Sequence, residues 1–246
     1  MADLTANQRS FVEMMQLSDE HAIRGFDLLL KRPHFLDFFE PLIEAGLFAP
    51  EKNPAPVKAD KEGAYRIPYW KALDYLTACA KVAGEHDDAA LAGKILNIIR
   101  TVSAERDPAG ERANFYTFRR FAEILGLLPT SSVTAKHLEL IEGWLNTKFD
   151  HDMVANALDD GALPRFLNSG NPADWDKAVQ LFKYCTAIRW QPDRLDRGRC
   201  NCREAVLLGL LRSDNEMLRR VGIHVLSERW ESLGGSLPPV GSTGTV

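Results

Sequence analysis

Helical periodicity runs through nearly the whole sequence, and alternating strand patterns bounded by hairpin turns are missing from it. The periodic segments also share a spacing. Tyr75–Leu76 precedes Arg120–Phe121 by 45 residues, and Ile95–Leu96 precedes Leu140–Ile141 by the same 45 residues. An interval of about 40–47 residues is typical of HEAT and armadillo repeats. This spacing constrains the fold more than any other feature of the chain.

A single amphipathic helix pair cannot bury its own apolar face, whereas stacked pairs bury that face against one another. We therefore predict an all-α fold: a short HEAT/armadillo-like α-solenoid of stacked antiparallel helix pairs with an N-terminal helical cap. An irregular helical bundle is the alternative, because the residues of the two pairs barely repeat. The predicted organisation is a helical cap over 1–46, a proline-rich crossover loop over 47–68, helical repeats over 69–233, and a disordered tail or truncated linker over 234–246.

Residues with capping and helix-ending preferences place the first helices. Thr5 and Ser18 are predicted N-caps, because their side chains can accept the free amides of a first helical turn. Pro33 suits the first turn of a third helix that ends at Gly46, and Pro41 is expected to kink that helix. The later helices are expected in four pairs: 69–84 with 87–105, 111–128 with 131–148, 151–167 with 171–190, and 199–214 with 215–233.

The segment 46–70 interrupts the helical pattern with four prolines and several lysines. Loops of about 20 residues inside a compact domain are often functional or disordered. The segment ends in a cluster of aromatic and apolar residues, which we expect to hold its far end onto the next helix pair: Tyr65, Ile67, Pro68, Tyr69 and Trp70. The interpretation we favour is a fixed crossover between cap and repeats, and a partner-binding loop is the alternative.

Composition and charge exclude several classes of protein. The 246 residues are 45% hydrophobic and carry a formal charge of −4, so the chain as a whole is not biased toward nucleic acid or anionic membranes. No apolar run approaches the roughly 20 residues that span a bilayer, and the first residues do not form a secretory signal. Four cysteines are too few for a disulfide scaffold, so we expect a cytoplasmic protein.

Histidine and aspartate residues offer one candidate for catalysis. His34, the doublet His86–Asp87, and Asp150 or Asp152 could together hold a divalent metal, as in an HD-type phosphohydrolase. However, Asp87 and its neighbour Asp88 also fit the role of helix N-terminal capping and dipole partners. The aspartates between 150 and 160 lack the alternating ligands of a calcium loop and fit caps and turns.

The cysteines give a weaker signal. Cys200 and Cys202 form a C-x-C pair, whereas zinc sites favour two to four intervening residues and a second pair of ligands. A redox pair is the other alternative for these two thiols. Cys79 and Cys185 lie in apolar helical segments, where cysteine is usually a small buried hydrophobe. We therefore expect neither a metal nor a cofactor, and no serine, histidine and aspartate can be placed as a nucleophile with its base.

Arginines gather in 189–203, between the third and the last of the predicted helix pairs, and three more follow at Arg212, Arg219 and Arg220. Their forked side chains match phosphate oxygens, so a nucleic-acid surface over 189–220 is one alternative, and loop or inter-repeat ion pairs are another. The predicted partner-binding surface combines the 50–66 loop with the basic segment 189–203: Lys58, Tyr65, Arg189, Arg194, Arg197, Arg199 and Arg203.

Several stretches resemble a helical-repeat region of large bacterial proteins, many of them NTPase-like or associated with phage defence. These are "LIEAGLFAPEKNPAP", "YRIPYWKALDYLTACA", "KAVQLFKYCTAIRW" and "LRRVGIHVLSERWE", and the resemblance covers about residues 42–230. It implies a sensor, scaffold or regulatory region without catalytic residues of its own. This chain departs from such proteins in being far shorter, and it carries no GxxxxGK[ST] phosphate loop.

Together these observations predict a non-catalytic protein–protein interaction scaffold or regulatory subunit. We expect its partner to be another protein in a larger complex, and the resemblance places it in a bacterial antiviral defence system. Helix-pair stacks suit this role because they present long rigid surfaces and need no reactive groups. The alternatives are a nucleic-acid-binding repeat protein that uses the arginines of 189–220, and the HD-type metal phosphohydrolase.

Overall fold

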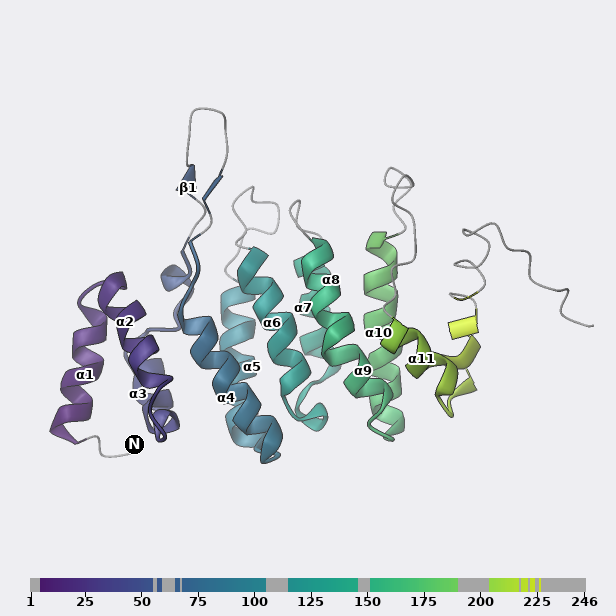
Figure 1. The fold of residues 1–246 in the computed structure, drawn as a ribbon, viewed down its shortest axis with the longest axis horizontal. Coiled ribbons are helices and arrows are strands. Elements are labelled where there is room, and N and C mark those ends of the chain that lie inside the picture. Colours follow the sequence, from purple (N-terminus) through teal and green to yellow (C-terminus); the bar gives the residue numbers. More distant parts are fainter. Residues whose placement is uncertain are drawn as a thin grey trace, which may run out of the picture. The chain divides into compact units, whose positions relative to one another are not determined.

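The computed structural model describes residues 5–54, 57–58, 65–66, 68–104, 115–145, 151–189, 204–216, 218–220, 222–223 and 226. Apart from one pair of two-residue strands, the regular structure of this part is helical, so the predicted all-α class is confirmed (Figure 1). The chain divides into two compact units, residues 1–162 and 163–246, and each is described by itself.

The first unit contains the longer series of elements: α1 (Ala6–Gln16), α2 (Asp19–Leu29), the 3-10 helix η1 (Phe35–Phe38), α3 (Phe39–Glu44), η2 (Pro50–Lys52), β1 (Val57–Lys58), β2 (Tyr65–Arg66), α4 (Ala72–Glu85), α5 (Ala89–Ala104), α6 (Phe115–Leu127), η3 (Thr130–Ser132), α7 (Ala135–Leu145) and α8 (His151–Asp160). Then follow α9 (Ala162–Leu167), α10 (Pro172–Arg189) and α11 (Glu204–Arg212).

Both predicted N-caps are confirmed. The Thr5 amide donates to Gln8 Oε1 at 2.9 Å, and the Gln8 amide donates back to Thr5 Oγ1 at 3.3 Å. This reciprocal pair is a capping box, which satisfies amides that a helix start leaves free. At the start of α2, the His21 amide donates to Ser18 Oγ at 3.3 Å. The local sequence therefore determines where the first two helices begin.

Two predicted helices are each split in the structure, and a proline explains each split. The segment 33–46 forms η1 followed by the short α3, with Pro41 in the first turn of α3. The segment 151–167 forms α8 and α9, with Pro164 in the first turn of α9. Proline has no amide to donate and fits a first turn better than a helix interior, so each helix restarts just before its proline.

The end of α3 was predicted correctly. Gly46 has a φ of +70°, its amide donates to Ile43 O at 2.9 Å, and the Leu47 amide donates to Leu42 O at 3.0 Å. These two bonds form a Schellman motif, in which glycine is favoured because it adopts a left-handed conformation without strain. Leu42 and Leu47 are both buried, so the turn also joins the core.

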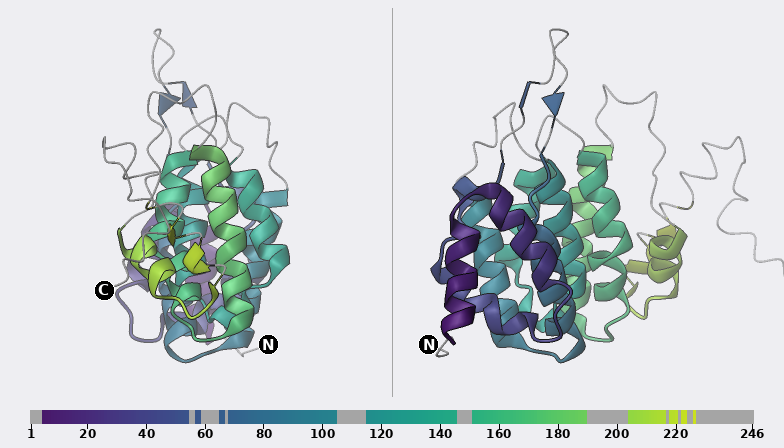
Figure 2. Two further views of the ribbon diagram at one scale, coloured as in Figure 1. Left: turned by 90° about the vertical axis from the view of Figure 1, so that its right-hand side faces the viewer. Right: turned by 60° about the vertical axis from the view of Figure 1, so that its left-hand side comes forward.

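Within the first unit, several helices contact others that do not follow them directly in the chain. α2 contacts α4, α4 contacts α6, and α6 contacts α8, while α5 contacts α7 (Figure 1, Figure 2). α4 also packs on α5, and α6 on α7. The two segments that the sequence places 45 residues apart are therefore spatial neighbours. Leu76 on α4 and Phe121 on α6, one interval apart, are both fully buried.

An aromatic cluster joins α2, η1 and the segment after α3 to α4. Its centre is the buried Tyr75, whose ring lies 5.7 Å from Phe26, 5.8 Å from Phe35 and 6.1 Å from Phe48, between ring centroids. The Tyr75 hydroxyl donates to Phe35 O at 2.5 Å, so the polar end of this buried ring is satisfied. Because aromatic side chains bury large areas, this cluster fixes the N-terminal helices onto the helices that follow.

A second aromatic contact joins α5, α6 and α7. The Trp144 ring stacks on Phe118 with 5.9 Å between centroids and lies 5.8 Å from Phe121. Its indole Nε1 donates to Ser103 Oγ at 3.1 Å. One buried tryptophan thus connects three neighbouring helices.

The second unit is shorter. α10 begins with Pro172 after Asn171, whose Oδ1 accepts the Ala173 amide at 3.1 Å. Lys177 forms an ion pair with the buried Asp174 at 2.7 Å, and its Nζ also lies over the Phe166 ring. α11 begins within the predicted segment 199–214, and Gly222 lies close to Leu210 and Leu211.

Candidate functional site

The structure leaves most of the predicted partner-binding residues untested. Arg194, Arg197, Arg199 and Arg203 lie outside the described residues, and Arg189 is described only as the last residue of α10. These positions stay a prediction. Of the arginines further along, Arg219 donates to Ser213 O at 2.7 Å and Arg220 pairs with Glu216 at 2.5 Å, while Arg212 is exposed.

Lys58 and Tyr65 are brought together by the backbone. They are partners in the antiparallel pair β1–β2, in which Val57 faces Arg66 and Lys58 faces Tyr65. The expectation of a loop without secondary structure was therefore wrong for these four residues. The prolines around 50–56 favour extended backbone, which is the conformation that strand pairing requires.

Both ends of the 46–70 segment are held on α6. At the near end, Thr117 Oγ1 donates to Asn53 Oδ1 at 2.9 Å, and Thr117 is fully buried. At the far end, Trp70 is buried, and Arg120 Nε donates to the Tyr69 hydroxyl at 3.0 Å. The expectation that this aromatic cluster fixes the far end onto the next helix pair is confirmed for Tyr69, whose hydroxyl bonds Asp74 on α4, and Trp70 is buried.

Tyr69 belongs to a wider polar network, which we call the latch: Asp27, Tyr69, Lys71, Asp74, Arg120 and Glu123. The Tyr69 hydroxyl donates to Asp74 Oδ1 at 2.5 Å. Lys71 Nζ lies 2.9 Å from a carboxylate oxygen of Asp27 and 2.9 Å from one of Asp74. Arg120 reaches Asp74 at 3.3 Å and Glu123 at 2.5 Å. The latch therefore connects α2, α4 and α6 through half-buried charges.

The latch holds its groups in fixed protonation states. Burial opposes the charge of Asp74, but hydrogen bonds from Tyr69 and Lys71 outweigh it and lower the pKa of Asp74. Hydrogen bonds to Asp27 and Asp74 raise the pKa of Lys71, and burial together with the Asp74 contact raises the pKa of Tyr69 to about 12. A general acid or base works best with a pKa near neutrality. The pKa values of these groups instead fit a structural role, in which they hold neighbouring helices together.

Sequence reasoning did not single out the charged latch residues, although two signals were present. Lys71 and Asp74 are three residues apart on a helical segment, as are Arg120 and Glu123, and such pairs face one another. Asp74 and Arg120 are separated by 46 residues, almost one repeat interval. Charged residues one interval apart are expected to meet where neighbouring repeats pack together.

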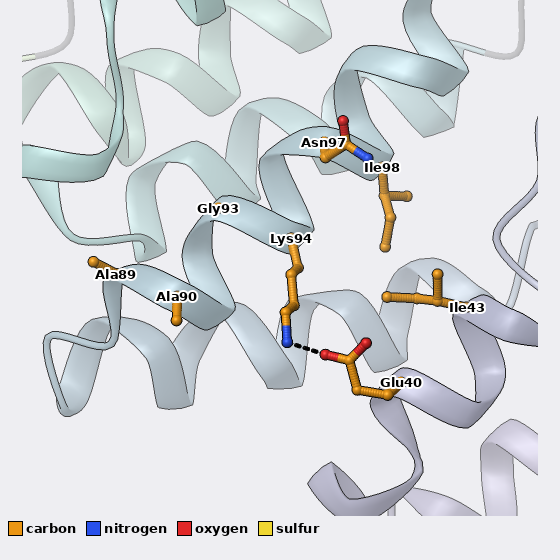
Figure 3. Close-up of a pocket in the computed structure, with 8 residues that line it drawn as sticks. All are labelled: Glu40, Ile43, Ala89, Ala90, Gly93, Lys94, Asn97 and Ile98. Carbon is orange, nitrogen blue, oxygen red and sulfur yellow. Dashed lines mark hydrogen bonds and ion pairs between the residues drawn. The ribbon is translucent and has the colours of Figure 1, made fainter. Parts of the chain in front are cut away.

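A groove lies between α3 and α5 (Figure 3). Its volume is about 450 Å³, and its lining comes from those two helices: Glu40, Ile43, Ala89, Ala90, Gly93, Lys94, Asn97 and Ile98. Lys94 reaches from α5 to form an ion pair with Glu40 on α3, and Ile43 and Ile98 lie toward one end (Figure 3). Small exposed residues of α5 form the rest of the wall.

The groove is suited to contact and not to reaction. Its two charged groups neutralise each other, and Ile98 is buried beneath its surface. A Cβ atom added at Gly93 would meet no atom within 4 Å. Helix backbones approach each other closely where both carry small residues, and apolar contact supplies the binding energy. We therefore treat this groove as the candidate docking surface of the first unit.

The metal-binding alternative gains no support from the described part of the chain, in which no three histidine, cysteine, aspartate or glutamate side chains gather into a group. His86 and Asp87 lie in the turn after α4, and Asp88 Oδ1 accepts the amides of Ala90 and Leu91 at 3.0 Å each. The capping interpretation is thus confirmed for Asp88. Asp150 and the Asp152 side chain lie outside the described structure, so the phosphohydrolase stays an untested prediction.

Cys79 behaves as a buried hydrophobe, as predicted. The side chain is fully buried on α4, and burial raises the pKa of its thiol to about 12. Because the thiolate is the reactive form of cysteine, this residue is unreactive at neutral pH. Cys200 and Cys202 lie outside the described residues.

Among the described helices, none is long and apolar enough to cross a membrane. Comparison of the chain with protein-family models, with curated proteins and with solved structures finds no match in any of the three. The function must therefore be argued from the residues and their geometry.

Proposed function

We propose that this chain is a HEAT-like helical-repeat protein that serves as a non-catalytic scaffold or regulatory subunit. The observation that supports the proposal best is the order of helix contacts in the first unit. α4 contacts α6 and α5 contacts α7, which are the neighbours that a repeat of about 45 residues requires, and α2 and α8 extend the same row by contacting α4 and α6. In this proposal the helix pairs are antiparallel and stack as a solenoid.

The resemblance to helical-repeat regions of bacterial NTPase-like and phage-defence proteins gives the proposal its biological setting. We place the protein in the cytoplasm, as a subunit of a larger complex. Repeat surfaces of this kind bind partners through a few well-placed side chains on a rigid framework. The latch supplies such rigidity here, because it fixes α2, α4 and α6 to one another through Asp27, Asp74 and Arg120.

The groove between α3 and α5 is the proposed docking surface of the first unit, and its proposed occupant is a helical segment of another protein. Ala90 and Gly93 are exposed and allow a second helix to approach closely, while the partly exposed Ile43 offers apolar contact. The paired charges of Glu40 and Lys94 would orient polar groups of the partner.

A bulky substitution inside the groove tests this surface. Gly93→Arg is expected to leave the fold intact, because Gly93 is exposed, an added Cβ there would meet no atom within 4 Å, and arginine favours a helix more than glycine. The matched control is Gly143→Arg on α7, which is also exposed, lies within a helix and has no atom within 4 Å of an added Cβ. Circular dichroism and thermal unfolding would verify that both variants fold.

The measurement is affinity capture from cells of the native host with quantitative mass spectrometry, followed by binding assays with the purified partner. A partner retained by the unmodified chain and by Gly143→Arg, but at least about tenfold weaker with Gly93→Arg, would support the proposal; tenfold corresponds to roughly 1.4 kcal/mol. Equal binding by both variants would exclude the groove. Failure to retain any protein reproducibly would count against a scaffold role altogether.

A further inference from the structure

The start of α7 carries one of the two hydrogen bonds of a capping box, with histidine as its acceptor. Thr134 precedes the helix, and the residue at its third position is His137. The Thr134 amide donates to His137 Nδ1 at 3.0 Å, and the Thr134 hydroxyl lies 3.1 Å from the same nitrogen. Glutamate or glutamine usually accepts this amide, as Gln8 does for Thr5 in α1. In α7 an imidazole takes that role.

This geometry requires a neutral imidazole. A backbone amide can only donate, so Nδ1 must present its lone pair, and the proton of the neutral ring must sit on Nε2. A protonated ring carries hydrogens on both nitrogens, so Nδ1 would face the Thr134 amide as a second donor. Protonation is therefore incompatible with this cap, whereas a carboxamide at the same position would be indifferent to pH.

The surroundings of His137 also disfavour its charged form. The side chain is half-buried, and burial together with the positive charge of Arg100 on α5 lowers the pKa of the imidazole. α7 packs against α5, α6 and α8. The described charged residues on those elements and on α7 itself are Lys94, Arg100, Arg119, Arg120, Glu123, Lys136, Glu139, Glu142, Asp159 and Asp160.

We propose that Thr134 and His137 form a pH-sensitive cap, which fixes the start of α7 against α5 at neutral pH and releases it on acidification. Release would free the Thr134 amide and place two positive charges, those of His137 and Arg100, close together at the contact between α5 and α7. This inference rests on the local geometry of the cap and does not depend on the proposed docking function.

The direction of the pH effect follows from linkage. Because the pKa of His137 in the folded chain lies below its ordinary value of 6.5, the unfolded chain binds more protons in this range. The contribution of the cap to folding stability is therefore present above pH 6.5 and is lost as the pH falls through the folded-state pKa. Acid should loosen the start of α7 before it unfolds the rest of the first unit.

Amide hydrogen exchange measured by NMR between pH 7.5 and 5 tests the proposal. After correction for the intrinsic pH dependence of exchange, the Thr134 amide should lose protection by about fivefold on acidification, the effect of losing one N-cap. In His137→Gln the protection should stay constant, because glutamine accepts the amide at every pH. His21→Gln is the matched control, since His21 holds the same position in α2 with Nδ1 at 2.8 Å from Ser18 Oγ.

Constant Thr134 protection in the unmodified chain would overturn the proposal, as would an equal loss of protection in His137→Gln. A loss of the acid response in the His21→Gln control would also overturn it, by assigning the response to α2. Arg100→Gln provides an independent check that does not alter the cap. Removal of the neighbouring positive charge should raise the pH at which His137 titrates, observed through its ring proton signals, and an unchanged midpoint would refute the proposed repulsion.

Discussion

The contact between α6 and the end of α8 differs sharply from the contact between α3 and α5, although a helical glycine lies at each. At the first, a methyl group added to Gly126 would lie 2.8 Å from backbone atoms of Gly161 and Ala162. At the second, a methyl group added to Gly93 would meet nothing within 4 Å. At Gly126 the glycine allows two backbones to touch, whereas at Gly93 no atom lies close to the glycine.

The difference indicates two uses of a helical glycine. Glycine in a helix interior costs about 1 kcal/mol relative to alanine, so it needs a compensating benefit. At Gly126 that benefit is close backbone packing within the fold. At Gly93, as at Gly143, an added Cβ would meet no atom within 4 Å, so no close contact explains the glycine. The predictions below test this contrast, beginning with the largest effect.

Gly126→Ala should be the most damaging of the substitutions considered. The added methyl group would overlap backbone atoms, which cannot move aside as the end of a flexible side chain can. Overpacking of this kind costs about 1–3 kcal/mol, and we expect about 2 kcal/mol after the gain in helix propensity. Urea unfolding would measure it. If Gly126→Ala proved as stable as the original chain, the contrast between the two contacts would not hold.

In the latch, charged side chains hold neighbouring helices together, in contrast to the two glycine contacts. Asp74→Ala should destabilise the first unit by about 1–2 kcal/mol, because it removes the partner of Tyr69, Lys71 and Arg120 from a half-buried site. The control is Lys81→Ala, which breaks an exposed pair with Glu85 on the same helix and should cost less than about 0.5 kcal/mol. Equal effects in the two variants would mean that the latch contributes no more than a surface ion pair.

The latch should also make stability depend on pH in acid. The pKa of Asp74 in the folded chain lies below its ordinary value of 3.8. Its contribution is therefore complete above pH 3.8 and is lost as the pH falls through the folded-state pKa. Urea unfolding at a series of pH values should show a smaller loss in acid for Asp74→Asn than for the unmodified chain. A parallel loss in both chains would assign the acid sensitivity to other carboxylates.

Local signals in the sequence were enough to predict much of the fold. Thr5, Ser18 and Gly46 mark helix ends because each satisfies backbone groups within its own turn. The segments that are 45 residues apart, α4 with α6 and α5 with α7, contact one another, and their equivalence as repeats stays a prediction. Pro41 was misjudged, because a proline can kink one helix or begin another, and only the packing of neighbouring elements decides between the two.

The candidate sites were harder to predict. The groove depends on how α3 approaches α5, and residues such as Gly93 and Ala90 carry no chemical signal of their own. The latch depends on contacts between helices far apart in the sequence, such as Arg120 with Tyr69 across 51 residues. The sequence analysis instead selected the arginines near 189–203, because their charge is easy to recognise. Charge alone does not reveal which surfaces the packing of the helices leaves exposed.

Gly93→Ala should have the opposite sign from Gly126→Ala. With open space around the new methyl group, alanine should stabilise the helix by about 0.5–1 kcal/mol. Gly143→Ala on α7 should stabilise by a similar amount, since its surroundings are equally open. Thermal unfolding of both variants would measure these gains. A destabilising Gly93→Ala would show that the groove is narrower in solution and would weaken its assignment as a docking surface.

The ion pair between Lys94 and Glu40 should contribute least of all. Both side chains are about half exposed, with 50% and 46% of their surface accessible, so water and salt screen their attraction. A double-mutant cycle with Lys94→Ala and Glu40→Ala should give a coupling energy of about 0.5 kcal/mol or less. That coupling should fall further in 1 M salt. A coupling energy above about 1 kcal/mol that persists in 1 M salt would mean that this ion pair holds α3 tightly against α5. The groove would then be part of the packed fold and would not be a docking surface.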